Sequence, residues 1–274
     1  MKLVNLIAPL AFLLTGASAH AGWSIKFKDP KGDDRGPGKY SYPTDAVYTS
    51  GSFDLLELNV TDQGADIQLD LVFNATIEDP WGMAKQGGAN FSVQFVQIYV
   101  DTDHKSKSGE LTALAGMNAV FQDESAFERV ILVSPQPGAR VKQEVAQKSP
   151  KHKNLLVVPR EISAKGKTIT AKIAKKDLGQ PTDQWGWQAL VASNEGYPAN
   201  TDVLCRKVNE YEGQHRFGGG DDYEGDPNFM DILVSPAKGD SAEKDAQFKI
   251  LSGYVSGADQ NKWKRAVLPM VYGK

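Results

Sequence analysis

The chain has 274 residues, of which 31 are lysine or arginine and 34 are aspartate or glutamate, so its formal net charge is −3. Lysine and arginine are not clustered in a basic block, and contacts to phosphates require such clusters. The sequence therefore argues against a nucleic-acid partner. The charged fraction of 24% argues against both a membrane bundle and a disordered tail. The single cysteine, Cys205, excludes an intrachain disulfide framework and a cysteine-based zinc site.

The first 21 residues have the pattern of a secretory signal peptide. Lys2 gives a positive start, an apolar stretch follows, and Ala21 ends a small-x-small cleavage pattern. The apolar stretch is shorter than the roughly 18 to 20 residues that span a bilayer, and no later stretch is long enough. We therefore predict cleavage after Ala21 and a soluble product in the periplasm or outside the cell. Residues 22–274 are predicted to form a single domain without a membrane span.

In chain order, the first predicted strands form a hairpin. Residues 52–60 read as a strand, Gln63-Gly64 as a turn, and the apolar residues at positions 67 to 73 alternate with polar ones. In residues 91–100 the apolar residues change phase, which indicates either a bulge or a strand buried on both faces. Further strands are predicted at residues 129–133 and 155–158, around Lys165-Gly166-Lys167, and at residues 187–192. Short strands at this spacing, without helical crossovers, predict an all-β antiparallel sandwich.

Helix signals are poor throughout, and residues 241–253 are the best candidate for a helix. Residues 142–153 are polar and rich in lysine, which predicts a solvated loop or, as the alternative, a basic contact surface. In residues 241–253 the apolar positions mix helical and strand spacing. The pattern leaves the structure of this second segment open.

Acidic residues gather beside glycines in three segments, residues 29–38, 101–109 and 218–226. Calcium takes six to eight oxygen ligands, and glycine-bearing turns can aim backbone carbonyls at the ion. These segments are therefore candidate calcium loops, although none has the EF-hand pattern. Two alternatives stay open, namely ordinary turns and a pair of carboxylates that hydrolyses glycosidic bonds. A serine hydrolase is disfavoured because the chain has no Gly-x-Ser-x-Gly elbow.

Aromatic residues in loops suggest a second kind of site. Trp81 follows Asp79-Pro80, Tyr40 and Tyr42 follow the first acidic segment, and Trp185 stands just before a predicted strand. Flat rings in such positions can stack on sugar faces. Trp81 is the first choice as an exposed ring. Methionines leave open a haem site of the kind that secreted sandwich domains hold, but there is no Cys-x-x-Cys-His attachment motif.

Five motifs taken together carry a resemblance to a known family. They are Asp29-Pro30-x-Gly32-Asp33-Asp34-x-Gly36-Pro37-Gly38-x-Tyr40-x-Tyr42-Pro43-Thr44, Ser52-Phe53-Asp54-Leu55, Pro80-Trp81-Gly82, Tyr99-Val100-Asp101-Thr102-Asp103, and Phe217-Gly218-Gly219-Gly220 with Asp226-Pro227-Asn228 and Asp231. With these motifs the chain resembles the C-terminal binding-module family of glucodextranase, which also occurs in amylopullulanase-type enzymes. Residues 169–193 are also similar to the sandwich group of DOMON domains and family 9 carbohydrate-binding modules.

The resemblance implies a jelly-roll-like β-sandwich that is not an enzyme, is stabilised by calcium, and binds a polysaccharide or a surface glycan. Carried over position by position, it makes Asp33, Asp34 and Asp54 the first candidate calcium ligands, followed by Asp29, Asp101 and Asp103. A DOMON-like periplasmic haem or redox-partner domain is the alternative function. A protein partner in the cell envelope is left open.

Overall fold

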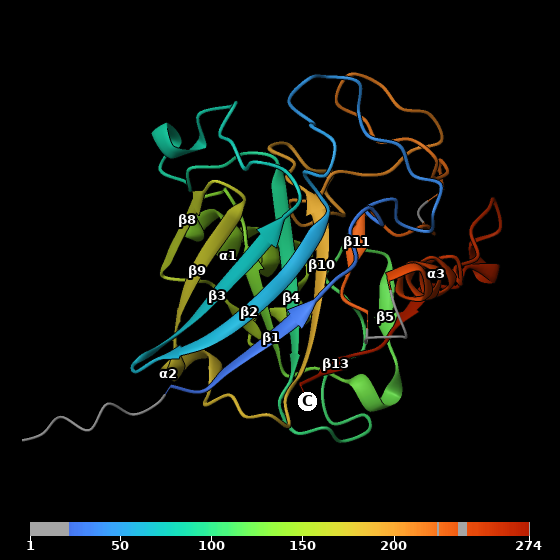
Figure 1. Ribbon diagram of the computed structural model, residues 1–274. Helices are drawn as coiled ribbons and strands as arrows, with labels where there is room; N and C mark the ends of the chain where they lie inside the picture. The colour runs from blue at the N-terminus through green and yellow to red at the C-terminus, as the bar shows by residue number, and fades with distance from the viewer. Residues whose placement is uncertain (1–21, 224, 235–239, 274) are drawn as a thin grey trace, which may run out of the picture.

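The computed structural model describes residues 22–223, 225–234 and 240–273 (Figure 1). The predicted signal peptide lies outside these residues. Two β-sheets pack face to face, with β1, β2 and β3 in front of β4 and β10 in the view of Figure 1. The predicted all-β sandwich is confirmed, whereas the jelly-roll connectivity stays a prediction.

The first sheet has five strands in the order β1-β2-β3-β9-β8, and every neighbouring pair is antiparallel. The strands are β1 (Ser24–Lys28), β2 (Leu55–Gln63), β3 (Asp66–Phe73), β8 (Glu161–Lys165) and β9 (Thr168–Ala174). The predicted hairpin is confirmed as β2 and β3, which turn at Gly64 with a positive φ of 78° that favours glycine. In β9 every second residue is buried, so one face of this sheet points to the core.

The second sheet runs in the order β11-β10-β4-β6-β7, and β13 also pairs with β10. Its pairs are antiparallel except for β6 with β7. The strands are β4 (Gln94–Asp101), β6 (Arg129–Val133), β7 (Leu156–Val157), β10 (Gly186–Ser193), β11 (Asp231–Ile232) and β13 (Val271–Tyr272).

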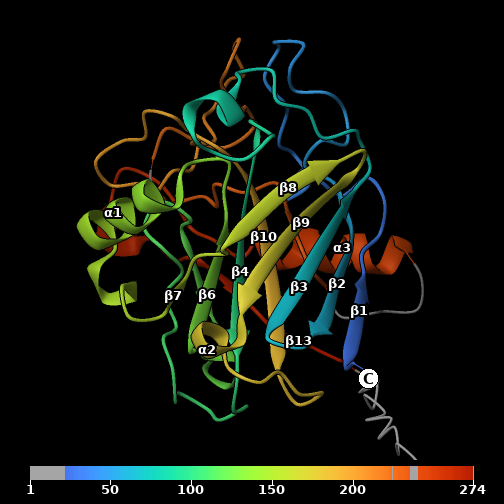
Figure 2. The same ribbon diagram turned by 90° about the vertical axis from the view of Figure 1, so that its left-hand side faces the viewer.

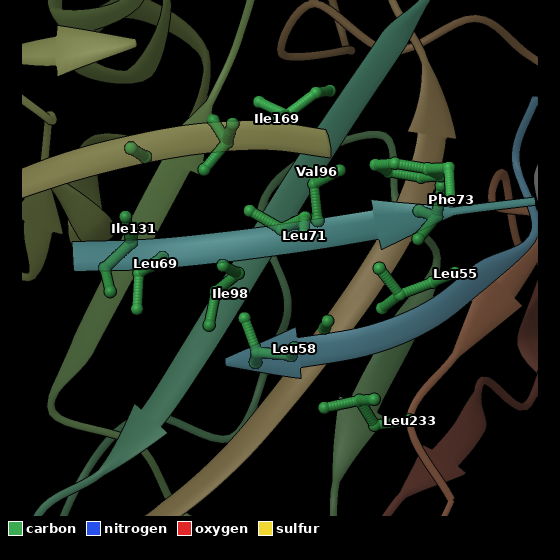
Figure 3. Close-up of a cluster of buried hydrophobic side chains, with 14 of the residues drawn as sticks. Leu55, Leu58, Leu69, Leu71, Phe73, Val96, Ile98, Ile131, Ile169 and Leu233 are labelled. Carbon is green, nitrogen blue, oxygen red and sulfur yellow. The ribbon is translucent and has the colours of Figure 1, made fainter. Parts of the chain in front are cut away.

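Apolar side chains of both sheets form the main core (Figure 3). Leu69, Leu71 and Phe73 of β3 point toward the second sheet, where Val96 and Ile98 of β4 meet them. All five side chains are fully buried. Removing this apolar area from water supplies most of the driving force that holds the sheets together.

A second core covers the outer face of the second sheet, so β4 and β10 are buried at every position. This explains the change of phase in residues 91–100: of the two interpretations, burial on both faces is confirmed. The covering elements are β5 (Ala119–Phe121), α1 (Gly138–Lys148), α3 (Asp240–Leu251) and β12 (Ala266–Leu268). Figure 2 shows α1 alongside β6 and β7, on the side away from β1.

The loop predicted over residues 142–153 is wrong in its first half, because α1 occupies it. Val141 and Val145, four residues apart, lie on one helix face and are buried. Glu144 makes ion pairs of 3.7 Å with Arg140 and 2.8 Å with Lys148 along the same helix. The helix therefore packs on the sheet through only two apolar positions. Among so many lysines, two apolar residues do not give a recognisable helical pattern in the sequence.

Residues 241–253, for which the sequence pattern favours neither helix nor strand, are mostly helical, because α3 spans Asp240–Leu251. Gln247 and Leu251, one turn apart, are both fully buried. A polar residue on the buried face breaks the apolar period, which is why the sequence favours neither structure. The remaining elements are short: α2 (Lys175–Leu178) and the 3-10 turns η1 (Met83–Gln86), η2 (Asp123–Ser125), η3 (Pro150–His152) and η4 (Gln260–Lys262). Among the described residues, no helix is long and apolar enough to cross a membrane.

Candidate functional site

Buried aspartates meet where the ends of β1, β2 and β11 come together. Asp29 directly follows β1, Asp54 directly precedes β2, and the antiparallel pairing of Lys28 with Glu57 brings these two chain positions to the same end of the sheet. Asp231 opens β11 in the other sheet. One carboxylate oxygen each from Asp29, Asp33 and Asp231 lie within 4.8 Å of one another.

The carboxylate oxygens of Asp29 and Asp33 are buried without hydrogen-bond donors from the part of the chain that the structure describes. Their side chains are only 8% and 0% exposed, and none of their four carboxylate oxygens has a hydrogen-bond partner among the described residues. An unpaired buried polar group costs free energy, and an unpaired buried charge costs far more. The two carboxylates therefore require a proton or a cation.

Asp54 has hydrogen-bond donors on one of its carboxylate oxygens, and Asp231 has backbone donors on both. Asp54 Oδ2 accepts hydrogen bonds of 2.9 Å from the Gly32 N–H and from Asn74, while its buried Oδ1 has no partner among the described residues. Asp231 Oδ2 accepts from the Leu55 N–H at 2.8 Å. Asp231 therefore ties β11 of the second sheet to the start of β2 in the first.

Burial and mutual repulsion raise the pKa values of the whole group. Burial and then the charge of Asp54 raise the pKa of Asp33 to about 7, and burial raises that of Asp54 to about 6. Burial raises the pKa values of Asp29 and Asp231 well above the ordinary range, and the neighbouring aspartates add to this. The charge of Lys244 on α3 lowers the pKa of Asp33, but by less than burial and the charge of Asp54 raise it.

Asp34 is placed differently from its neighbour Asp33. Its Oδ2 accepts a short hydrogen bond from the hydroxyl of Tyr42, and Tyr42 in turn accepts one of 3.1 Å from the Phe53 N–H. Burial raises the pKa of Asp34, and the hydrogen bond from Tyr42 lowers it. Tyr42 thus fixes the turn that carries Asp33 and Asp34.

The loop that carries these residues is held from both sides. A Cβ on Gly36, which has a φ of 52°, would lie 2.3 Å from the ring of Tyr40, so this close approach requires glycine. On the other side, the amide of Gln247 on α3 donates to the Asp33 carbonyl at 2.6 Å and accepts from the Ile232 N–H at 3.2 Å. Gln247, the buried polar residue that interrupts the apolar pattern of α3, is therefore part of the site.

The donor set has the chemistry of a calcium site. Carboxylate oxygens are hard ligands, and calcium binds six to eight of them at 2.3–2.6 Å in flexible geometry. The described residues near the cluster supply no thiolate or imidazole ligand to it, and a zinc site would favour those. Five buried carboxylate oxygens without a hydrogen-bond partner in the described part of the chain, two on Asp29, two on Asp33 and one on Asp54, fit one hard divalent cation.

A second acidic group consists of Asp101, Asp103 and Glu128. Here the side chains already have donors: Asp101 accepts from Tyr272 at 2.7 Å, Asp103 from Ser108 at 2.7 Å, and Glu128 from the Thr102 N–H at 2.7 Å. Asp101 Oδ1 also accepts from the Asp103 and His104 N–H groups at 3.1 and 2.7 Å, which are the hydrogen bonds of an ordinary aspartate turn. Because nothing in this group lacks a partner, we leave Asp101 and Asp103 out of the metal site proposed below.

The four predicted sugar-stacking residues are not gathered in one place. Tyr40 is 2% exposed and donates to the Pro227 carbonyl at 2.9 Å, and Tyr42 is engaged with Asp34. Trp185 is 7% exposed and lies 6.2 Å from Trp187, ring centre to ring centre. These three rings stabilise the fold. Tyr42 and Trp81 are both half-buried, and Trp81 borders an open cleft.

Asp231, Gln247 and Glu128 belong to these groups although no pattern in the sequence predicts it. Asp231 stands at the end of the last family motif, three residues after Asn228, and that position was its only signal. Its contact with Leu55 spans 176 positions of the chain and depends on the pairing of β11 with β10. No local pattern encodes such a contact.

Comparison with known proteins assigns the chain to a family. A family model described as the C-terminal binding-module, SLH-like, of glucodextranase matches residues 25–270. No curated protein matches the sequence. The family match takes in the acidic cluster, Trp81 and both sheets except for β13, and it confirms the resemblance carried by the five motifs. The chain therefore belongs to the family of SLH-like C-terminal binding modules of glucodextranase.

Proposed function

We propose that the mature chain is a secreted, non-catalytic module that binds a polysaccharide or surface glycan and is stabilised by calcium. The observation that carries the binding function is the family match over residues 25–270. Trp81 supports it, because this ring borders an open cleft at the loop end of the sandwich. Aromatic residues with polar neighbours are the usual means of holding sugar rings.

Calcium would be held by Asp29, Asp33, Asp54 and Asp231, with the remaining ligands from backbone carbonyls or water. The support is the burial of these carboxylates together with the orphaned oxygens of Asp29 and Asp33. The ion would neutralise their repulsion and join the end of β1, the start of β2 and the start of β11. Its role in this proposal is structural: it locks the two sheets together at the end where the long loops lie.

Secretion is proposed from the first 21 residues. The positive start, the apolar stretch and the small residues before Gly22 support it. Expression of the full chain in a bacterial host should yield a periplasmic or extracellular product that begins at Gly22. N-terminal sequencing checks this, and a cell-associated product that still begins at Met1 would contradict it.

Binding is tested on a glycan array, with the mature chain in a buffer that contains calcium. We expect binding to a restricted set of glycans with modest affinity, because shallow sugar sites yield little free energy per contact. Affinity should increase when several copies are presented together. An array without a single bound glycan would refute the proposal, and a Soret absorbance band in protein from the native host would favour the haem alternative.

A further inference from the structure

An open cleft of about 420 Å³ lies at the loop end of the second sheet. It is bordered by the loop that precedes η1, the loop that follows β10, and the start of α1. Its size falls in the range of small-molecule sites, roughly 300–1,000 Å³. Its lining combines aromatic and apolar surface with side chains that can hydrogen-bond, notably Trp81, Met83, Gln86, Arg140, Tyr197 and His215.

Tyr197 stands at the rim with 96% of its surface exposed. The loop beneath it is nevertheless fixed: the Tyr197 N–H donates to Glu195 at 2.9 Å, and Glu195 forms a 2.8 Å ion pair with Arg206. Arg140 on α1 also donates to the Gly196 carbonyl. These contacts hold the loop that carries Tyr197 in place, while the ring itself faces solvent.

Trp81 forms another wall of the same cleft. Its ring packs edge-on against Tyr48 at 6.1 Å and His215 at 6.3 Å between ring centres, and its backbone N–H donates to Ser92 at 3.2 Å. These contacts fix the ring while leaving it half-exposed. Two positioned aromatic rings on separate loops therefore border one cavity.

The charges of the cleft are balanced by carboxylates. Arg206 faces Glu195 at 2.8 Å, Arg140 faces Glu144 at 3.7 Å, and His215 lies 4.0 Å from Asp45. An acidic sugar would meet no unpaired cation on this lining, and it would have to compete with these carboxylates. Hydroxyl groups of a neutral sugar can instead use the amide and guanidinium donors at the walls.

We propose that this cleft is the glycan-binding site, and that it takes a short stretch of a neutral polysaccharide with sugar rings against Tyr197 and Trp81. This inference rests on the proposed function and assigns it a place and a ligand class. The apolar C–H face of a hexose matches the aromatic rings, and the ring hydroxyls match the polar rim. None of the buried aspartates lines the cleft, so sugar binding and metal binding can be tested separately.

The test measures binding of the full mature chain, with calcium present, to dextran, amylopectin and a mixed-linkage β-glucan, and to polygalacturonate as the acidic probe. The wild type should bind a neutral polymer and ignore the acidic one. Tyr197→Ala and Trp81→Ala should each weaken that binding by about tenfold or more, the loss expected for one stacking ring. Tyr211→Ala is the matched control, because Tyr211 is 66% exposed and lies outside the cleft.

Thermal melts show that the variants fold, and Tyr197→Ala should melt like the wild type because the ring is exposed. If the wild type binds a neutral polymer and Tyr197→Ala binds it equally well, the cleft is not the site, although glycan binding stands. Binding to polygalacturonate alone would overturn the neutral ligand class. A wild type that binds none of the four polymers would overturn this inference. If it also binds nothing on the glycan array, the proposed glycan-binding function is refuted as well.

Discussion

Asp33→Asn should abolish the stabilisation of the fold by calcium while leaving the chelated protein at least as stable as the wild type. The asparagine keeps the shape of the side chain but removes a charge that is fully buried beside Asp54 and Asp34. At calcium concentrations about 1,000 times the dissociation constant, the wild type gains about 4 kcal/mol from the ion. Urea unfolding in calcium and in EDTA, for both proteins, measures the two effects separately.

A structural role for Asp33 would give the opposite pattern. If the side chain merely supported the loop, the variant would lose stability in EDTA and would keep its response to calcium. Asp103→Asn serves as the control, because Asp103 belongs to an acidic turn whose oxygens already have donors in Ser108 and the Lys105 N–H. Its calcium response should equal that of the wild type.

The chelated wild type should lose stability as the pH rises from about 4 to about 7. The folded-state pKa of Asp33 is about 7 against an ordinary value of 3.8, so the folded state holds a proton in this range that the unfolded state releases. The associated stability is fully present below the unfolded pKa and is lost as the pH passes the folded pKa. For Asp33 alone the loss is roughly 4 kcal/mol.

Calcium should reverse this dependence, because the ion competes with protons for the same oxygens. The difference in unfolding free energy between calcium and EDTA should therefore increase from pH 5 to pH 8. Denaturant midpoints across this range check both statements, and Asp33→Asn should flatten the profile in EDTA. A chelated wild type whose stability is constant or rises over this range would contradict the electrostatic account of the cluster.

Much of the fold can be predicted from local patterns in the sequence. The hairpin of β2 and β3 follows from alternating apolar residues around Gln63-Gly64, because one face of the first sheet is buried and the other is not. The change of phase of the apolar residues in β4 indicates a bulge or a strand buried on both faces, and both faces of the second sheet are indeed covered. By contrast, α1 has only two buried apolar positions, and the buried side of α3 includes a glutamine.

The candidate site can be predicted only in part. The first acidic motif identifies Asp29 and Asp33, and their burial depends on β1 and β2 lying side by side. Asp231 completes the group through sheet pairing, which no local signal reports. The loop aromatics mislead for a similar reason: Tyr40 is buried against distant residues, whereas Tyr197, which has no motif around it, is the exposed ring of the cleft.

The proposed calcium site is tested by isothermal titration calorimetry at about pH 7.5, with calcium titrated into the mature wild type after chelation has removed any bound metal. We expect one saturable binding event with release of protons, so that the measured heat changes with the ionisation enthalpy of the buffer. The Asp33→Asn variant should lose the event, and Asp103→Asn should keep it. A folded wild type that binds no calcium would rule out the proposed metal site.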